Sequence, residues 1–296
     1  MKNSTWLLDY RFDEHSQSGE DGIIKKILNI LSNTNKWCVE FGAWDGLYLT
    51  NTRRLILAEG YSGVLIEANK KKFERLKLNY SNHKDKVTPI NRFVGFGDDD
   101  NLDCILANTA IPYDFDLLSI DIDGNDYHVW KRVLRYRPKL VVIEFNQTIP
   151  SEVWFVQKPN PALNQGASIL SLFELGKEKG YELVCVLSYN AFFVRKEDFH
   201  LFEIHDNTPT SLRTDLSAIT YLFSGYDGTI FLSGSKTLPW HKTSLSERQI
   251  QVLPSFFRMF PDNYSIIQKW LFFVFRAFKN PQAIFKKVIS KASFKS

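Results

Sequence analysis

Short apolar segments alternate with amphipathic helical patterns over the first half of the chain, and this alternation constrains the fold more than any other feature. The expected strands are Trp37–Phe41, Val64–Glu67, Val87–Phe93, Phe115–Asp121 and Lys139–Phe145. The expected helices are Asp21–Leu31, the pattern around Leu55–Leu57, Asn69–Asn79 and Asp126–Leu134. Apolar strands that alternate with helices form a parallel sheet covered on both faces. The sequence therefore predicts an α/β fold.

The pattern changes after the fifth strand. A helix is expected at Ile169–Lys179, and Gly180 ends it. Two strand-like segments, Glu182–Leu187 and Ala191–Arg195, then flank the residues 188–190, which are typical of a hairpin turn. A parallel sheet that ends in an antiparallel hairpin is the layout of Rossmann-like class I methyltransferases, whereas NAD-binding domains add another parallel strand. We expect a mostly parallel seven-stranded sheet ending in an antiparallel hairpin, followed by C-terminal helices.

The charge of the chain is divided unevenly. The formal net charge is +4, but seven basic and no acidic side chains follow Tyr264, which leaves 30 basic against 33 acidic side chains elsewhere. A mildly acidic body argues against nucleic acid as a partner. We expect three parts: a cofactor-binding domain at 1–198, an acceptor-side extension at 199–250 and a basic amphipathic helical tail at 251–296.

The tail places aromatic and aliphatic residues on one helical face and lysine or arginine on the other. Basic amphipathic helices with Trp and Phe lie in anionic membrane interfaces. The alternative is that the tail packs on the body or on a partner subunit of a homo-oligomer. Three cysteines without paired spacing indicate free thiols, and neither a signal peptide nor a membrane span is visible. We expect a cytoplasmic protein, with peripheral association of the tail with the inner face of the membrane.

Glycines and acidic residues follow the first expected strand, in the run Glu40-Phe41-Gly42-Ala43-Trp44-Asp45-Gly46. A dinucleotide fold places three glycines here to seat a pyrophosphate. In this chain two glycines stand beside carboxylates that would repel phosphate but suit the cationic sulfonium and amino groups of S-adenosylmethionine (SAM). We expect Glu40, Gly42, Asp45 and Gly46 to contact SAM; the alternative is a purely structural tight turn.

Two further segments are candidates for cofactor binding. Glu67, followed by Ala68, ends the second strand about twenty positions after the glycine turn, where an acidic residue binds both ribose hydroxyls. Gln17, Glu20 and Asp21 precede the first helix. They either close over the methionine end of SAM or cap that helix.

Polar residues gather after the fourth and fifth strands, which should be neighbours in the sheet. Asp121, Asp123, Glu144 and Asn146 are expected in one crevice, where they would bind magnesium or a similar cation, fix sugar hydroxyls or act as a general base. Asn125 and Asp126 are better explained as turn formers and helix caps.

Histidines are the other candidates for the base that an alcohol acceptor needs. They are His128, His205 and His241. The alternative for each histidine is an ordinary surface position. A carboxylate such as Asp121 or Asp123 is an equally good candidate for the general base.

The chain resembles FkbM-type SAM-dependent methyltransferases in the runs 60–69, 121–124 and 138–144. The segments 16–23 and 190–195 match a subgroup of bacterial surface-glycan relatives, and the resemblance covers roughly residues 15–196. It implies methyl transfer from SAM to an oxygen, often that of a sugar hydroxyl. One departure is that Asp123 stands where the family has glutamate.

The resulting hypothesis is an O-methyltransferase acting on a bacterial surface glycan or its precursor. Two alternatives from other classes stay open. The first is an NAD- or nucleotide-sugar-binding oxidoreductase, and the second is a non-catalytic interaction protein on a methyltransferase fold.

Overall fold

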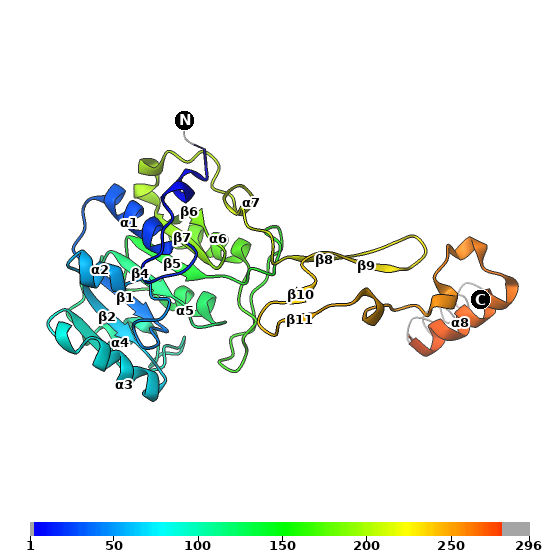
Figure 1. The fold of residues 1–296 in the computed structure, drawn as a ribbon, viewed down its shortest axis with the longest axis horizontal. Coiled ribbons are helices and arrows are strands. Elements are labelled where there is room, and N and C mark those ends of the chain that lie inside the picture. The colour runs from blue at the N-terminus through cyan, green and yellow to red at the C-terminus, as the bar shows by residue number, and fades with distance from the viewer. Residues whose placement is uncertain (1–2, 280–296) are drawn as a thin grey trace, which may run out of the picture. The chain divides into compact units, whose positions relative to one another are not determined.

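The computed structural model describes residues 3–279, and the chain divides into two compact units (Figure 1). Unit 1 is Met1–Leu216, and unit 2 begins at Ser217. The three parts expected from the sequence, with boundaries after residues 198 and 250, stay a prediction. The helical pattern expected after Pro281 lies outside the described residues.

A seven-stranded sheet forms the centre of unit 1, in the strand order β3-β2-β1-β4-β5-β7-β6. The strand β7 runs antiparallel to both of its neighbours, and the other pairs are parallel. The strands are β1 Trp37–Phe41, β2 Ser62–Ile66, β3 Val87–Ile90, β4 Leu117–Ile120, β5 Leu140–Glu144, β6 Tyr181–Val186 and β7 Asn190–Arg195. This order is that of the Rossmann-like class I methyltransferase fold, so the predicted sheet with its terminal hairpin is confirmed.

Helices connect and cover these strands (Figure 1). The α-helices of unit 1 are α1 Glu20–Leu31, α2 Arg53–Ala58, α3 Lys70–Asn79, α4 Leu102–Leu106, α5 Asp126–Arg132, α6 Ile169–Glu178 and α7 Pro209–Leu212. Short 3-10 helices are η1 Trp6–Tyr10, η2 Ser81–His83 and η3 Lys196–Phe202. The helix α4 was not expected from the sequence, because it is too short to show a helical period. Asn101 defines its start by accepting a hydrogen bond from the N–H of Cys104.

The central strands are buried on both faces, as a parallel sheet requires. Every residue of β4 is buried, and so are all residues of β5 except Glu144 at its carboxyl end. At the opposite edge an ion pair joins Lys139 to Asp116, with 2.7 Å between Nζ and Oδ1, and Asp116 is fully buried. The carboxylate of Asp116 also accepts the N–H groups of Asn35 and Lys36. This pair therefore ties the starts of β1, β4 and β5 together.

Several strands end earlier than the sequence suggests, and the ends of β3 and β2 matter for the site. The third strand was expected to reach Phe93 but ends at Ile90. Asn91 leaves the ladder, and its side-chain amide donates to the carbonyl oxygens of Glu67 and Ala68. The second strand ends at Ile66, which leaves Glu67 as the first residue of the following loop.

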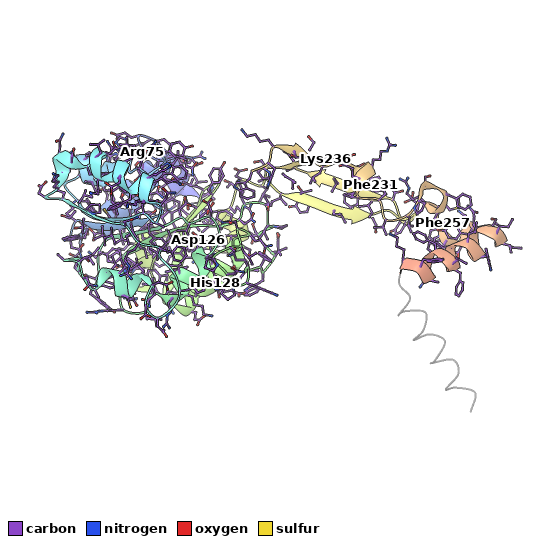
Figure 2. All side chains as sticks on the ribbon, turned by 90° about the horizontal axis from the view of Figure 1, so that it is seen from below. Arg75, Asp126, His128, Phe231, Lys236 and Phe257 are labelled. Atoms are coloured by element: carbon purple, nitrogen blue, oxygen red, sulfur yellow. The ribbon has the colours of Figure 1, made fainter. Side chains whose placement is uncertain are left out.

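The described part of unit 2, residues 217–279, consists of two small hairpins, three 3-10 turns and one helix. Its elements are β8 Thr220–Ser224, β9 Ile230–Gly234, β10 Thr237–Leu238, β11 Thr243–Ser244, η4 Glu247–Gln249, η5 Ser255–Phe257, η6 Pro261–Asn263 and α8 Ile266–Lys279. Phe257 is buried against the rings of Phe272 and Phe275 on α8 (Figure 2). Among residues 3–279, no helix has the length and apolar character needed to cross a membrane.

Candidate cofactor site and acidic crevice

The turn after β1 lies tightly against the ends of β2 and β4. Gly42 has a φ of +74°, and a Cβ at this position would lie 1.8 Å from the carbonyl oxygen of Asp121. Only glycine permits this approach. The N–H of Ala43 donates to the carbonyl oxygen of Ile66 over 3.2 Å. Gly46 is similarly confined, because its Cβ would meet the ring of Tyr80 at 2.5 Å. The turn therefore connects three strand ends at the carboxyl edge of the sheet.

Glu67 is buried, and the surrounding backbone fixes the orientation of its carboxylate. Its Oε2 accepts the N–H of Trp44 at 2.9 Å, and its Oε1 accepts the N–H of Asn69 at 2.6 Å. Each carboxylate oxygen has a second acceptor position. The side chain is therefore held in place with capacity for two more donors, next to the exposed Ala68.

Glu40 and Asp45 organise the loop that follows the glycine turn. The buried Glu40 carboxylate accepts the hydroxyls of Thr50 and Thr52 and the N–H of Asn51. Burial raises the pKa of Glu40. Asp45 accepts the N–H groups of Leu47 and Tyr48. These bonds stabilise the loop, and the contacts with SAM expected for both residues stay a prediction. The polar run 50–52 carried no recognised sequence signal, because an isolated Thr-Asn-Thr is common in loops.

Glu20 and Asp21 were expected before the first helix, but they form the first turn of α1 and have different hydrogen-bond partners. Asp21 holds its own loop, since its Oδ2 accepts the N–H groups of Glu14, His15 and Ser16. Glu20 instead accepts the side-chain amide of Asn190 at 2.6 Å and the N–H of Gln17 at 3.4 Å. This contact joins the two distant sequence segments that resemble the surface-glycan subgroup.

Burial raises the pKa of Glu20 to about 8, and the charge of Asp121 contributes. Asn190 itself is opposite Glu144 in the pairing of β5 with β7. Glu20 therefore belongs to the same electrostatic environment as the ends of β4 and β5. No sequence signal marked Asn190, because an asparagine next to a hairpin turn is commonplace.

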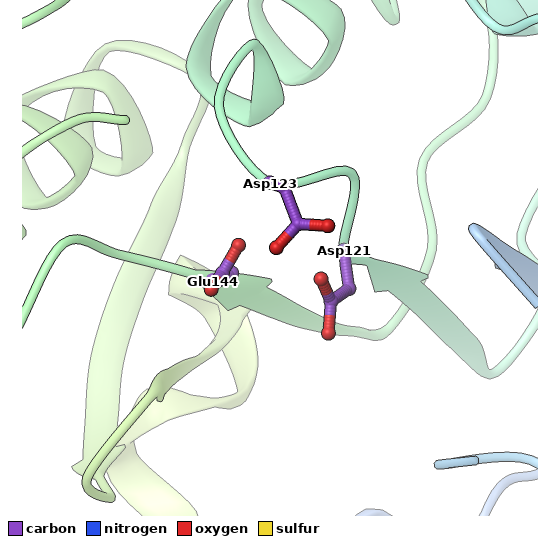
Figure 3. A group of neighbouring side chains, drawn as sticks. All are labelled: Asp121, Asp123 and Glu144. Carbon is purple, nitrogen blue, oxygen red and sulfur yellow. The ribbon is translucent and has the colours of Figure 1, made fainter. Parts of the chain in front are cut away.

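Three carboxylates meet where β4 and β5 end (Figure 3). One oxygen from each of Asp121, Asp123 and Glu144 lies within 4.8 Å of the others. The pKa of Asp121 is raised to about 7, chiefly by burial and also by the charges of Asp126 and Asp123. The pKa of Glu144 is raised well above its usual range, chiefly by burial and then by Asp121. Ionisation of Asp121 and Glu144 together is unfavourable at this separation, so the pair favours sharing a proton or attracting a positive group.

Asp126 shapes the loop that carries two of these carboxylates. Its Oδ1 accepts the N–H of Ile122 at 2.9 Å, and its Oδ2 accepts the N–H of Gly124 at 2.8 Å. These bonds hold Asp123 in the left-handed region, with a φ of +57°. The interpretation of Asp126 as a turn former is therefore confirmed by its hydrogen bonds. Its burial raises its pKa to about 6.

The remaining expected residues lie apart from the three clustered carboxylates. Asn146 uses its amide within the loop after β5, accepting from Thr148 and donating to the carbonyl oxygen of Gln165. The Nε2 of His128 lies 2.8 Å from the carbonyl oxygen of Gln157 (Figure 2). His205 is exposed after η3, and His241 is exposed between β10 and β11 in unit 2. Of the residues expected in the crevice, the structure brings together Asp121, Asp123 and Glu144.

Comparison with known proteins gives no match to a family model or to a curated protein. Among solved structures, the chain is similar to the N-terminal domain of EvdMO1 crystallised with SAH and D-fucose (13% identity, 65% of this chain, 93% of that one, TM-score 0.40). It is also similar to a SAM-dependent methyltransferase from Aquifex aeolicus (11% identity, 66% and 98%, TM-score 0.37). A third is the CurJ carbon methyltransferase (9% identity, 66% and 58%, TM-score 0.41). The likeness concerns the fold.

Proposed function

We propose that unit 1 binds SAM and transfers its methyl group to a hydroxyl of a bacterial surface glycan or glycan precursor. The observation that carries this proposal is the acceptor-rich edge formed by Glu67, Asp121 and Glu144 around the glycine turn. SAM carries a sulfonium, an ammonium group and a ribose diol, which are cationic groups and donors. A dinucleotide would instead bring phosphates towards carboxylates, which is unfavourable.

Unsatisfied acceptors in the same region support a cationic ligand. The side-chain oxygens of Asn190 and Asn51 are buried and have no hydrogen-bond partner among the described residues. Asn190 contacts Glu20, and Asn51 donates to Ser119 on β4. Buried amide oxygens are normally paired, so these two are suited to donors from a ligand. Glu67 would hold the ribose hydroxyls, and Glu20 with Asn190 would face the methionine part.

Bound SAM supplies an electrophilic methyl group, and the chain must position a hydroxyl oxygen and accept its proton. Asp121 and Glu144 lie at the carboxyl edge of the sheet, where ligands bind in open α/β folds. We assign proton acceptance to this carboxylate pair and orientation of the sugar to the more exposed Asp123. His128 is a weaker candidate because its Nε2 is engaged by Gln157. The FkbM resemblance supports the choice of a glycan acceptor.

Transfer of a labelled methyl group tests the proposed reaction. The protein is incubated with methyl-labelled SAM and cell-envelope glycan or precursor fractions. We expect label in a base-stable, ether-linked methyl group, and a rate lowered about 100-fold or more in Asp121→Asn. The exposed Asp85 provides the matched control, since Asp85→Asn should keep full activity. Label in an ester or an amine, or equal rates in both variants, would contradict the assignment.

A divalent cation such as magnesium is an additional candidate ligand for Asp121, Asp123 and Glu144. The three oxygens are close enough to share one hard cation. Calorimetric titration with magnesium should give saturable binding that Asp123→Asn weakens. Absence of magnesium binding, together with full activity after chelation, would exclude a metal site. The three carboxylates would then serve only to accept a proton and to bind the sugar.

We also propose that α8 associates with an anionic membrane surface. Phe272 and Phe275 pack inside unit 2, while Ile266, Ile267 and Trp270 are 87%, 70% and 65% exposed. An exposed apolar face next to basic side chains suits an anionic interface, and each Lys or Arg near it contributes about 1 kcal/mol.

Sedimentation with anionic vesicles tests this association. Trp270→Glu should reduce vesicle binding without lowering the melting temperature, because most of the Trp270 side chain is exposed to solvent. Concentration-dependent dimers that ignore vesicles would instead assign this face to a second copy of the chain.

A further inference from the structure

Unit 2 contains a cavity of about 670 Å³ that the methyl-transfer reaction does not use. Residues from the β8–β9 turn, from the segment beginning at η4 and from α8 line it. Three of its lining side chains are basic: Arg248, Arg258 and Lys279. None of these three forms an ion pair with another described residue at salt-bridge distance. Their charges are therefore available to a ligand in the cavity.

The one acidic side chain in the lining is already engaged. Oε1 of Glu247 accepts the N–H of Leu232 at 3.3 Å and pairs with Nζ of Lys236 at 3.2 Å (Figure 2). Outside the lining, Asp227 interacts electrostatically with Arg258. Two hydrogen bonds from Thr229 hold that carboxylate, and they are the main reason that its pKa is lowered. The surroundings of the cavity thus leave an excess of positive charge inside it.

Arg258 gives the most specific indication of a ligand. Its Nε is buried and has no hydrogen-bond acceptor among residues 3–279. A buried guanidinium N–H without an acceptor is costly, and a bound anion would supply the acceptor that Arg258 lacks. The planar guanidinium presents paired donors that match the oxygens of a phosphate group.

The rest of the lining is apolar. Val252, Leu253, Pro254 and Phe275 contribute hydrocarbon surface next to the three cations. Two of the lining residues, Phe275 and Lys279, belong to α8, whose other face carries the exposed Ile266 and Trp270. A cavity that combines cations with an apolar wall suits a ligand that combines an anion with a hydrocarbon chain.

We propose that this cavity binds the phosphate or diphosphate group of an amphiphilic ligand. Arg248 and Arg258 bind the phosphoryl oxygens, Lys279 adds charge, and the apolar wall contacts the adjoining hydrocarbon. This assignment does not depend on SAM binding by unit 1, and the assay below requires no methyl transfer. It also differs from attraction of α8 to a charged surface, because it requires particular side chains rather than total charge.

Two full-length double variants with the same change in charge distinguish binding in the cavity from general attraction of α8 to a charged surface. Arg248→Gln/Arg258→Gln removes two cations that line the cavity. Lys269→Gln/Arg276→Gln removes two cations of α8 that do not line it. Each protein is sedimented with phosphatidylcholine vesicles that contain phosphatidic acid or phosphatidylglycerol at equal charge, at about 0.15 M salt. Each is also titrated calorimetrically with inorganic pyrophosphate. The single variant Arg248→Gln is also measured. Because Arg248 is exposed, this variant should fold even if the double variant does not.

We expect the wild type to prefer phosphatidic acid over phosphatidylglycerol. The cavity variant should lose this preference and about tenfold or more in pyrophosphate affinity. The control should keep both the preference and the pyrophosphate affinity, and lose only general attraction of α8 to anionic vesicles. Saturable pyrophosphate binding with the same sensitivity to Arg248 and Arg258, but without vesicle binding, would assign the site to a soluble diphosphate. Equal losses of lipid preference and of pyrophosphate affinity in both double variants would overturn the proposal in favour of non-specific attraction. Absence of wild-type binding to both probes would overturn it as well.

Discussion

Asp121→Asn should stabilise unit 1 at neutral and alkaline pH, although it removes a proposed functional group. The pKa of Asp121 is raised from 3.8 to about 7, first by burial and then by neighbouring carboxylates. The folded chain therefore holds this proton more tightly than the unfolded chain. Its contribution to stability is complete below about pH 4 and is lost as the pH rises through 7.

The size of the effect follows from that shift. At about 1.4 kcal/mol per pKa unit, the full shift corresponds to on the order of 4 kcal/mol. Partial solvent exposure of the side chain reduces this, and we expect about 2 kcal/mol. For a domain of this size, that raises the melting temperature by roughly 4–8 °C. An asparagine amide can still donate to Glu144, which preserves the contact.

Thermal unfolding at pH 5 and pH 8 measures this prediction. The gain of Asp121→Asn over the wild type should be larger at pH 8. Asp123→Asn is the matched control, since it removes a carboxylate of the same cluster that is exposed, and its gain should be less than half as large. A lower melting temperature for Asp121→Asn at pH 8, or the same difference at both pH values, would refute the electrostatic description of the crevice.

Two further substitutions test the framework around the site. Gly42→Ala should lower the free energy of unfolding by more than about 3 kcal/mol, because its Cβ would lie 1.8 Å from a carbonyl oxygen at a φ of +74°; urea unfolding checks this, and a loss below about 1 kcal/mol would contradict it. Lys139→Met should cost about 3–5 kcal/mol by leaving Asp116 buried without its cation. The exposed Lys77→Met, whose ion pair with Glu74 lies on the surface, should change stability by less than about 1 kcal/mol in the same assay.

The order of secondary-structure elements could be predicted because the central strands of unit 1 are buried on both faces. Trp37–Phe41 is uniformly apolar apart from Glu40, and its observed bounds are those expected. The ends of strands were harder to predict when a side chain decided them. The third strand stops at Ile90 because Asn91 bonds across to the β2 loop, a contact between residues distant in sequence.

The acidic crevice was likewise predictable only where sheet topology, and not a distant side-chain contact, determines which residues meet. Asp121, Asp123 and Glu144 could be placed together because adjacent parallel strands bring their carboxyl ends to one edge. The contact between Glu20 and Asn190 could not be predicted, since a side-chain hydrogen bond joins residues 170 positions apart. Likewise, no local pattern indicates that Thr50 and Thr52 donate to Glu40. Periodicity reports which faces are buried, whereas these polar contacts depend on tertiary packing.

Calorimetric titration with S-adenosylhomocysteine and with NAD tests the central claim most directly. We expect micromolar binding of S-adenosylhomocysteine and none of NAD. Glu67→Ala should weaken that binding about 10- to 100-fold, as loss of charge-assisted contacts to two hydroxyls implies. The exposed Glu74→Ala should leave it unchanged. Binding of NAD in place of S-adenosylhomocysteine, or equal affinities for wild type and Glu67→Ala, would contradict the account.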